Sequence, residues 1–131
     1  MLTLPFWRDG FADVRLVGTY RHPLQVARSL HARGGMAYAQ AFELWRQYNA
    51  RLLDYRRHDH FPIVSFDLPD ADYRAAVARI ARTLGLDPGP APTGDAFFDA
   101  GLRTVDPPMD GPPMPPAVAA LLERLRQEAW P

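Results

Sequence analysis

The feature that most constrains the fold is a pair of short β-rich runs with a long helical stretch between them. Val14–Tyr20 (VRLVGTY) and Pro62–Phe66 (PIVSF) are rich in β-branched and aromatic residues and predict two buried strands. Parallel strands need a long crossover connection, usually helical, whereas antiparallel strands can be joined by a tight turn. The sequence therefore predicts an α/β fold with short parallel strands flanked by helices.

Helix boundaries follow from capping residues and from the spacing of apolar residues. Pro23 suits the first turn of a helix because its missing N–H would be unpaired there, and Gly34-Gly35 signals the end of that helix. Asp70 or Asp72 is expected to cap a later helix. Further helices are predicted at Met36–Arg57, with Ala41, Trp45, Tyr48, Leu52 and Tyr55 facing the core; at Ala71–Leu84, with Tyr73, Val77, Ile80 and Leu84; and at Pro116–Ala129, with Val118, Leu122, Leu125 and Ala129.

Two strands make a small sheet for a chain of 131 residues. Strands that are buried on both faces need neighbours, so either Leu2–Phe6 adds a third strand or something outside this chain completes the sheet. We therefore expect residues 1–131 to form a single partial domain, whose open sheet edge favours homodimerisation or aggregation. The proline-rich segment Leu86–Pro116 is expected to be a surface connection or lid anchored by Phe97 and Phe98.

Composition excludes several classes of function. The 15 basic and 15 acidic residues balance, so no global field draws the chain to nucleic acid or to an anionic membrane. The absence of cysteine excludes disulfides, thiolate metal sites and thiol nucleophiles. The sequence has no long apolar run and no basic leader, which predicts a cytoplasmic protein without a membrane span. All of the basic residues are arginine, so no mechanism can use a lysine of this chain.

Arg21 marks the predicted binding site, because it ends the first strand and directly precedes the helix that begins at Pro23. In open α/β sheets, ligands gather at the carboxyl ends of strands, and the unpaired N–H groups at the start of a helix attract anions. Gln25, Ser29 and Arg33 follow at steps of four residues and form a polar stripe on one helix face. A guanidinium fork and a hydroxyl in this position favour binding of a phosphate monoester.

The segment VRLVGTYRHPLQVARSLHAR resembles the second nucleotide-binding region of the sulfotransferase family. In that family a strand runs into an Arg-x-Pro turn and a serine follows eight residues after the arginine, a pattern that Arg21, Pro23 and Ser29 match. A weaker resemblance continues to Asp87. The resemblance implies a partial three-layer, P-loop-like sulfotransferase fold. It also implies that Arg21 and Ser29 bind the 3′-phosphate of 3′-phosphoadenosine-5′-phosphosulfate (PAPS), the sulfuryl donor, with 3′-phosphoadenosine 5′-phosphate as the product.

The chain departs from the family in the parts that perform the transfer. Sulfotransferases place a lysine-bearing phosphate loop, and a catalytic base that is often histidine, before the region that this chain resembles. No lysine and no G-x-x-x-x-G-K-[ST] loop occurs here, so no catalytic residue is carried over. The resemblance implies a domain that binds the donor for transfer to a hydroxyl or amine acceptor but is inactive alone. The alternatives are a non-catalytic nucleotide- or protein-binding remnant of the same fold, or an enzyme that uses another phosphate-bearing donor.

Other polar residues favour structural roles over chemistry. A pair of histidines around one aspartate has no evident third partner, which predicts a solvated turn and no metal site. The structural roles expected are this turn for His58–His60, packing at the helix start for His22, capping of the last helical carbonyls for Arg33, and helix capping for Asp67 and Asp70.

Overall fold

The computed structural model describes residues 4–86 and 111–130 of the chain. Its elements are, in order, α1 (Leu4–Gly10), β1 (Gly18–Tyr20), α2 (Pro23–Gly34), α3 (Tyr38–Asp59), β2 (Ile63–Ser65), α4 (Asp70–Thr83) and α5 (Pro116–Glu128). The two strands pair in parallel, with Gly18 opposite Ile63 and Tyr20 opposite Ser65. The prediction of a helix-rich α/β fold with short parallel strands is therefore confirmed.

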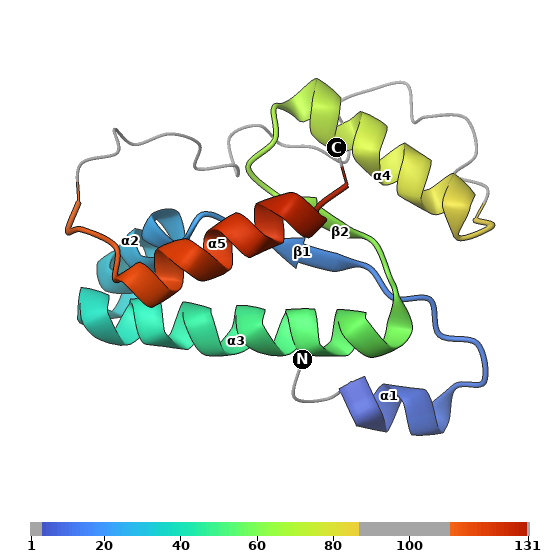
Figure 1. Ribbon diagram of the computed structural model, residues 1–131, viewed down its shortest axis with the longest axis horizontal. Coiled ribbons are helices and arrows are strands. Elements are labelled where there is room, and N and C mark those ends of the chain that lie inside the picture. The colour runs from blue at the N-terminus through green and yellow to red at the C-terminus, as the bar shows by residue number, and fades with distance from the viewer. Residues whose placement is uncertain (1–3, 87–110, 131) are drawn as a thin grey trace.

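Helices lie on both faces of the strand pair (Figure 1). On one face, Ile63 is buried in the core that α3 and α5 build together. On the other face, Val64 packs against Ala76 and Ile80 of α4. This division follows from the strand itself, because successive side chains of β2 point to opposite sides of the sheet. Helix α2 follows β1 directly and packs along α3.

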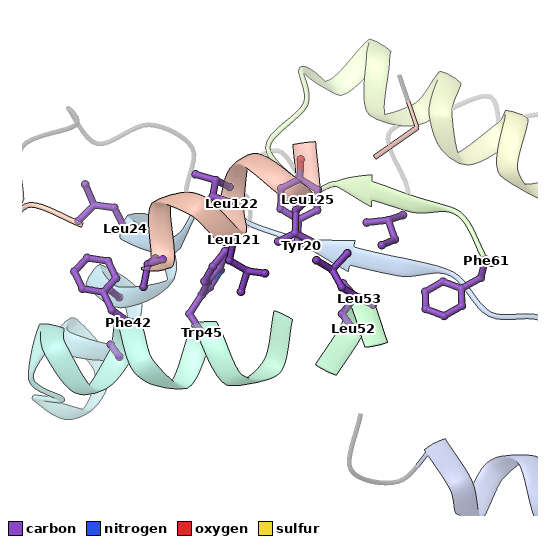
Figure 2. Packing of buried hydrophobic residues seen from close by; sticks show 14 residues of the cluster. Tyr20, Leu24, Phe42, Trp45, Leu52, Leu53, Phe61, Leu121, Leu122 and Leu125 are labelled. Carbon is purple, nitrogen blue, oxygen red and sulfur yellow. The ribbon is translucent and has the colours of Figure 1, made fainter. Parts of the chain in front are cut away.

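The main core lies between α3, α5 and the strands. Figure 2 shows the indole of Trp45 reaching from α3 towards Leu121 of α5, with Tyr20 of β1 beside them. The cluster holds fourteen buried residues, which come from β1, α2, α3, β2 and α5 and from Phe61, just before β2. Since α5 and β1 are far apart in sequence, the burial of this shared apolar surface holds α5 against the strands and α3.

Gly18 brings β1 close to its neighbours because it has no side chain. A Cβ atom at this position would lie 2.8 Å from Leu52 Cδ1 and 3.0 Å from side-chain atoms of both Ile63 and Phe61. Such distances are well below ordinary carbon–carbon contacts. The glycine therefore allows the strand to pack against α3 and β2 at this separation.

Several helix ends agree with the sequence signals. Helix α2 begins at Pro23, and Gly35 follows it with a φ of 66°. Gly85, which follows the end of α4, has a φ of 71°. Both glycines adopt the left-handed conformation that costs glycine little. The expected side-chain cap of α4 is wrong, because Pro69 is the N-cap residue; Asp70 and Asp72 lie in the first turn, where carboxylates favourably oppose the helix dipole.

The amino-terminal segment differs most from the prediction. Leu4–Gly10 forms a helix, so of the two alternatives for completing the sheet, a third strand at Leu2–Phe6 is wrong for the residues the structure describes. The ring of Trp7 stacks on Phe11 with centroids 5.8 Å apart and meets the edge of Phe6 at 5.5 Å. The (i, i+4) spacing of Trp7 and Phe11 brings two rings together on one helix face, which favours a helix over a strand here.

Strand lengths and two core positions also differ from the predictions. The first strand is shorter than Val14–Tyr20, because only Gly18–Tyr20 pairs with β2. Tyr48 and Val77 were expected in the core but are 47% and 43% exposed. Phe97 and Phe98 lie outside the described residues. In the described ranges, no helix is both long and apolar enough to cross a lipid bilayer.

The segment that follows α5 forms a backbone hydrogen bond with β2. After α5, Ala129 is extended and the N–H of Trp130 donates a hydrogen bond of 2.8 Å to the carbonyl of Ile63. The Trp130 ring packs in the small core of α4, and the guanidinium carbon of Arg79 lies 5.6 Å from its centre. In the part of the chain that the structure describes, the sheet contains β1 and β2 alone.

Candidate anion-binding site

Arg21 follows β1 directly, at the carboxyl end of the strand. Its backbone is fixed by the indole N–H of Trp45, which donates to the Arg21 carbonyl at 2.9 Å. Its guanidinium carbon lies 5.4 Å from the centre of the Phe66 ring, close enough for a cation–π interaction. Arg21 is thus held at a strand end, the place where α/β sheets collect ligands.

The polar contacts of Arg21 come from two different elements. Its Nε atom donates to Oε1 of Gln25, in the first turn of α2, at 2.9 Å. The same atom lies 3.3 Å from Oδ1 of Asp67, which follows β2. The second carboxylate oxygen of Asp67 accepts the backbone N–H of His22 at 2.5 Å. The donors at the tip of β1 therefore already hold one negatively charged group.

Ser29 makes its contacts further along α2. Its hydroxyl oxygen accepts hydrogen bonds from Nε of Arg33 at 3.1 Å and from Nη2 at 2.5 Å. Two (i, i+4) pairs thus follow one another along the chain: Arg21, just before α2, pairs with Gln25, and Ser29 pairs with Arg33 within the helix. The structure places Arg21 just before α2 and Ser29 within it, and it gives each a different partner, so their joint binding of one phosphate stays a prediction.

The His22 side chain pairs with one of the backbone N–H groups at the start of α2, which were expected to be open to an anion. Its ring atom Nδ1 accepts the N–H of Leu24 at 3.3 Å, and Pro23 has no N–H to offer. The ring is partly buried at this position, which agrees with a packing and capping role. The anion-binding capacity at the start of α2 therefore lies mainly with Arg21 and the N–H of His22.

Burial lowers the pKa of His22 below its usual 6.5; the nearby positive charge of Arg126 also lowers it, while the negative charge of Asp67 opposes these effects. As the pH falls, the imidazole of the unfolded chain is protonated at a higher pH than the imidazole of the folded chain. The stability contributed by the neutral ring is therefore complete above pH 6.5. It is lost as the pH falls through 6.5 towards the lower pKa of the folded state. Acidification should therefore destabilise the fold through His22.

We expect this loss to shrink in His22→Asn, because asparagine supplies a capping oxygen that does not titrate. The measurement is the free energy of unfolding in urea at about pH 7.5 and about pH 5.5, on either side of the usual histidine pKa. The wild type should lose more stability between these two conditions than the variant. Equal losses would show that the titration of His22 does not contribute.

An apolar cavity of about 380 Å³ lies among β1, α2 and α3. Its lining residues come from β1 and its end, from α2 and from α3: Thr19, Tyr20, Arg21, Val26, Leu30, Leu44, Trp45, Tyr48, Asn49 and Leu52. Leu44 and Tyr48 are exposed at this cavity, and Asn49 is buried, with its side-chain amide donating to the Trp45 carbonyl at 2.8 Å. Arg21 borders the cavity, whereas Ser29 is not among its lining residues.

The other polar residues considered in the sequence, among them His58 and His60, lie at helix ends or on the surface. His58 is exposed, and His60 follows the end of α3 in the left-handed conformation, with a φ of 50°. Within residues 4–86 and 111–130, no group of three or more histidine, cysteine or acidic side chains is arranged to hold a metal ion. Arg56 joins α3 to α5 through Glu128, 2.8 Å away, and also donates to the carbonyl of Phe61.

Asp67 is the site residue whose role the sequence analysis missed. It was expected to cap a helix, whereas its carboxylate contacts Arg21 and His22, 46 and 45 residues earlier. The parallel register is the signal that relates them: since Tyr20 lies opposite Ser65, the residues that follow the two strands emerge side by side. That register is not evident from local sequence patterns.

No protein-family model, curated protein or solved structure matches this chain. The candidate site therefore has to be argued from its own residues.

Proposed function

We propose that this chain is a sulfotransferase-like domain that binds the 3′-phosphate of PAPS through Arg21, with Ser29 as a second contact. The observation that carries the proposal is the arginine at the carboxyl end of β1, whose guanidinium and following N–H together hold a carboxylate. A phosphate monoester offers the same kind of acceptor oxygens with more charge. The Arg-x-Pro turn and the later serine supply the resemblance that points to this donor.

The surroundings of Arg21 support anion binding on physical grounds. The Arg21 side chain is 24% exposed, so ligand contacts there are screened less than at a fully solvated surface. Trp45 fixes the backbone, and Gln25 and Phe66 restrain the guanidinium from two sides. A guanidinium held in this way loses less conformational entropy when it binds a ligand.

Transfer itself needs groups that this chain does not carry. Sulfuryl transfer depends on neutralising the charge of the transferring group, in the way phosphoryl transfer does, and the family uses a lysine for this. Because these 131 residues include no lysine, we propose donor binding as the function of this chain and place catalysis with residues outside it. The same composition favours a second candidate, non-catalytic nucleotide binding on the same fold.

Arg21→Ala should weaken the binding of 3′-phosphoadenosine 5′-phosphate by about 1.5–3 kcal/mol, the range for hydrogen bonds to charged groups, or roughly tenfold to 150-fold in Kd. The measurement is isothermal titration calorimetry of the full chain. AMP, which lacks the 3′-phosphate, should bind the wild type and the variant equally weakly. Ser29→Ala should produce a smaller loss for the 3′-phosphonucleotide.

Arg46→Ala is the matched control, since it also removes one positive charge, but from an exposed ion pair with Glu43 on α3. Its Kd should equal that of the wild type. Equal affinity of the wild type and Arg21→Ala for the 3′-phosphonucleotide would contradict the proposed site. A wild type that does not distinguish this ligand from AMP would favour a different phosphate-bearing donor.

A further inference from the structure

The carboxylate of Asp67 lies where an anionic ligand of Arg21 would bind. Its two oxygens contact two different donors at the strand tip: Oδ1 is 3.3 Å from Nε of Arg21, and Oδ2 accepts the N–H of His22. A phosphate that used the Nε donor of Arg21 together with this N–H would need the same two positions. The polar interactions that define the site are therefore already made by a side chain of the protein.

The fold holds Asp67 in this position. The N–H of Asp67 donates to the hydroxyl of Ser65 at 3.2 Å, and the N–H of Phe66 donates to the carbonyl of Tyr20 at 2.8 Å. The Phe66 ring lies under the Arg21 guanidinium and meets Tyr73 of α4 edge-on, with centroids 5.6 Å apart. The position of the carboxylate is thus fixed by the sheet register and by the contact of Phe66 with α4.

The ion pair is partly shielded from solvent. The Arg21 and Asp67 side chains are each 24% exposed, less than both members of the α3 surface pair of Arg57 and Asp54, which are 62% and 67% exposed. Partial burial reduces screening, so an incoming phosphate would meet both competition for the donors and repulsion from the Asp67 charge.

We propose that Asp67 is an internal competitor that regulates this site: a phosphate monoester gains the Nε donor of Arg21 and the His22 N–H only by displacing the Asp67 carboxylate. The inference rests on the proposed function, because it concerns the same phosphate position. It follows that only a fraction of the molecules is competent to bind at any moment, which lowers the apparent affinity by that fraction. Asp67 acts here as a positioning residue, through its effect on Arg21.

The test is calorimetric titration of the full chain with 3′-phosphoadenosine 5′-phosphate. Asp67→Asn keeps the side-chain shape and an acceptor for the His22 N–H but removes the charge, and we expect it to bind at least about tenfold more tightly than the wild type. Asp54→Asn removes a carboxylate from the exposed pair on α3 and should leave Kd unchanged. Arg21→Ala combined with Asp67→Asn should abolish the gain.

Each outcome separates this inference from the proposed function. If the wild type and Asp67→Asn bind equally and Arg21→Ala binds weakly, the phosphate site stands and the competitor role is wrong. If neither the wild type nor Asp67→Asn binds, both proposals fail. A gain that persists in the double variant would show that the ligand does not use Arg21 and would overturn the inference. Asp67→Ser, whose short hydroxyl also accepts an N–H, provides the same test if the asparagine variant does not fold.

Discussion

Trp45→Ala should lower the free energy of unfolding by about 3–5 kcal/mol, the range for removing a large aromatic side chain from a core. Trp45 is 4% exposed and lies in the main core between α3 and α5. The substitution leaves a cavity and also removes the donor that the Arg21 carbonyl accepts at 2.9 Å. Urea unfolding followed by far-ultraviolet circular dichroism at neutral pH measures this change.

Two further variants show which part of the tryptophan matters. Trp45→Phe keeps an aromatic ring but loses the indole N–H, so we expect a loss of about 1–2 kcal/mol from the hydrogen bond and the smaller ring together. Val77→Ala removes an apolar side chain that is 43% exposed on α4 and should change the stability by less than about 0.5 kcal/mol. A loss below about 1 kcal/mol for Trp45→Ala would contradict the packing described here.

Leu125→Ala should cost about 2–5 kcal/mol, the range for a buried leucine. Leu125 has no exposed surface and comes from α5, which packs against both α3 and β2. Although residues 87–110 separate α4 from α5 in sequence, the side chains of α5 complete the main core. We therefore expect the variant to unfold in one transition with a lower midpoint, because α5 and the strands share one cooperative unit.

Arg124→Ala is the matched control for α5, because Arg124 directly precedes Leu125 and its side chain is exposed. It should change the free energy of unfolding by less than about 0.5 kcal/mol. Two separate transitions in Leu125→Ala, with α5 lost first, would show that this helix is an independent appendage. An unchanged midpoint would show that Leu125 is not buried in solution.

Local signals predicted the elements whose ends are fixed by a few neighbouring residues. Proline at the first turn and glycine in a left-handed conformation define the bounds of α2 in both the sequence and the structure. The buried face of α5 was predicted from apolar spacing, and Val118, Leu122 and Leu125 are buried as expected. In these cases the energies that decide the structure come from residues within one or two turns.

The residues whose burial was predicted wrongly are those whose exposure depends on tertiary packing. Tyr48 continues the apolar spacing of Trp45 and Leu52, but no described element covers it, so it is exposed beside the cavity. In α4, Ala76 takes the buried position that spacing assigned to Val77, because a small side chain suits the approach of the helix to β2. Spacing alone defines a face of the helix, whereas the neighbouring element decides which edge of that face is buried.

The candidate site was predictable only in part for the same reason. The place of Arg21 follows from the order of strand and helix, which the sequence displays. Its pairing with Asp67 depends on β1 and β2 being adjacent and in a particular register, and this brings together residues that are 46 positions apart. The pairing of Ser29 with Arg33 was within reach of the (i, i+4) rule, yet Arg33 was expected to cap helical carbonyls.

The two strands of the small sheet differ in what lies beside them. At β2 the amide of Trp130 already donates to the carbonyl of Ile63, so an additional strand would first have to displace the segment that follows α5. At β1 the residues Thr19 and Tyr20 line an apolar hollow, with the exposed side chains of Leu44 and Tyr48 beside it. The sheet is therefore asymmetric within the described residues: a backbone hydrogen bond occupies β2, whereas apolar surface remains beside β1 and the arginine that follows it.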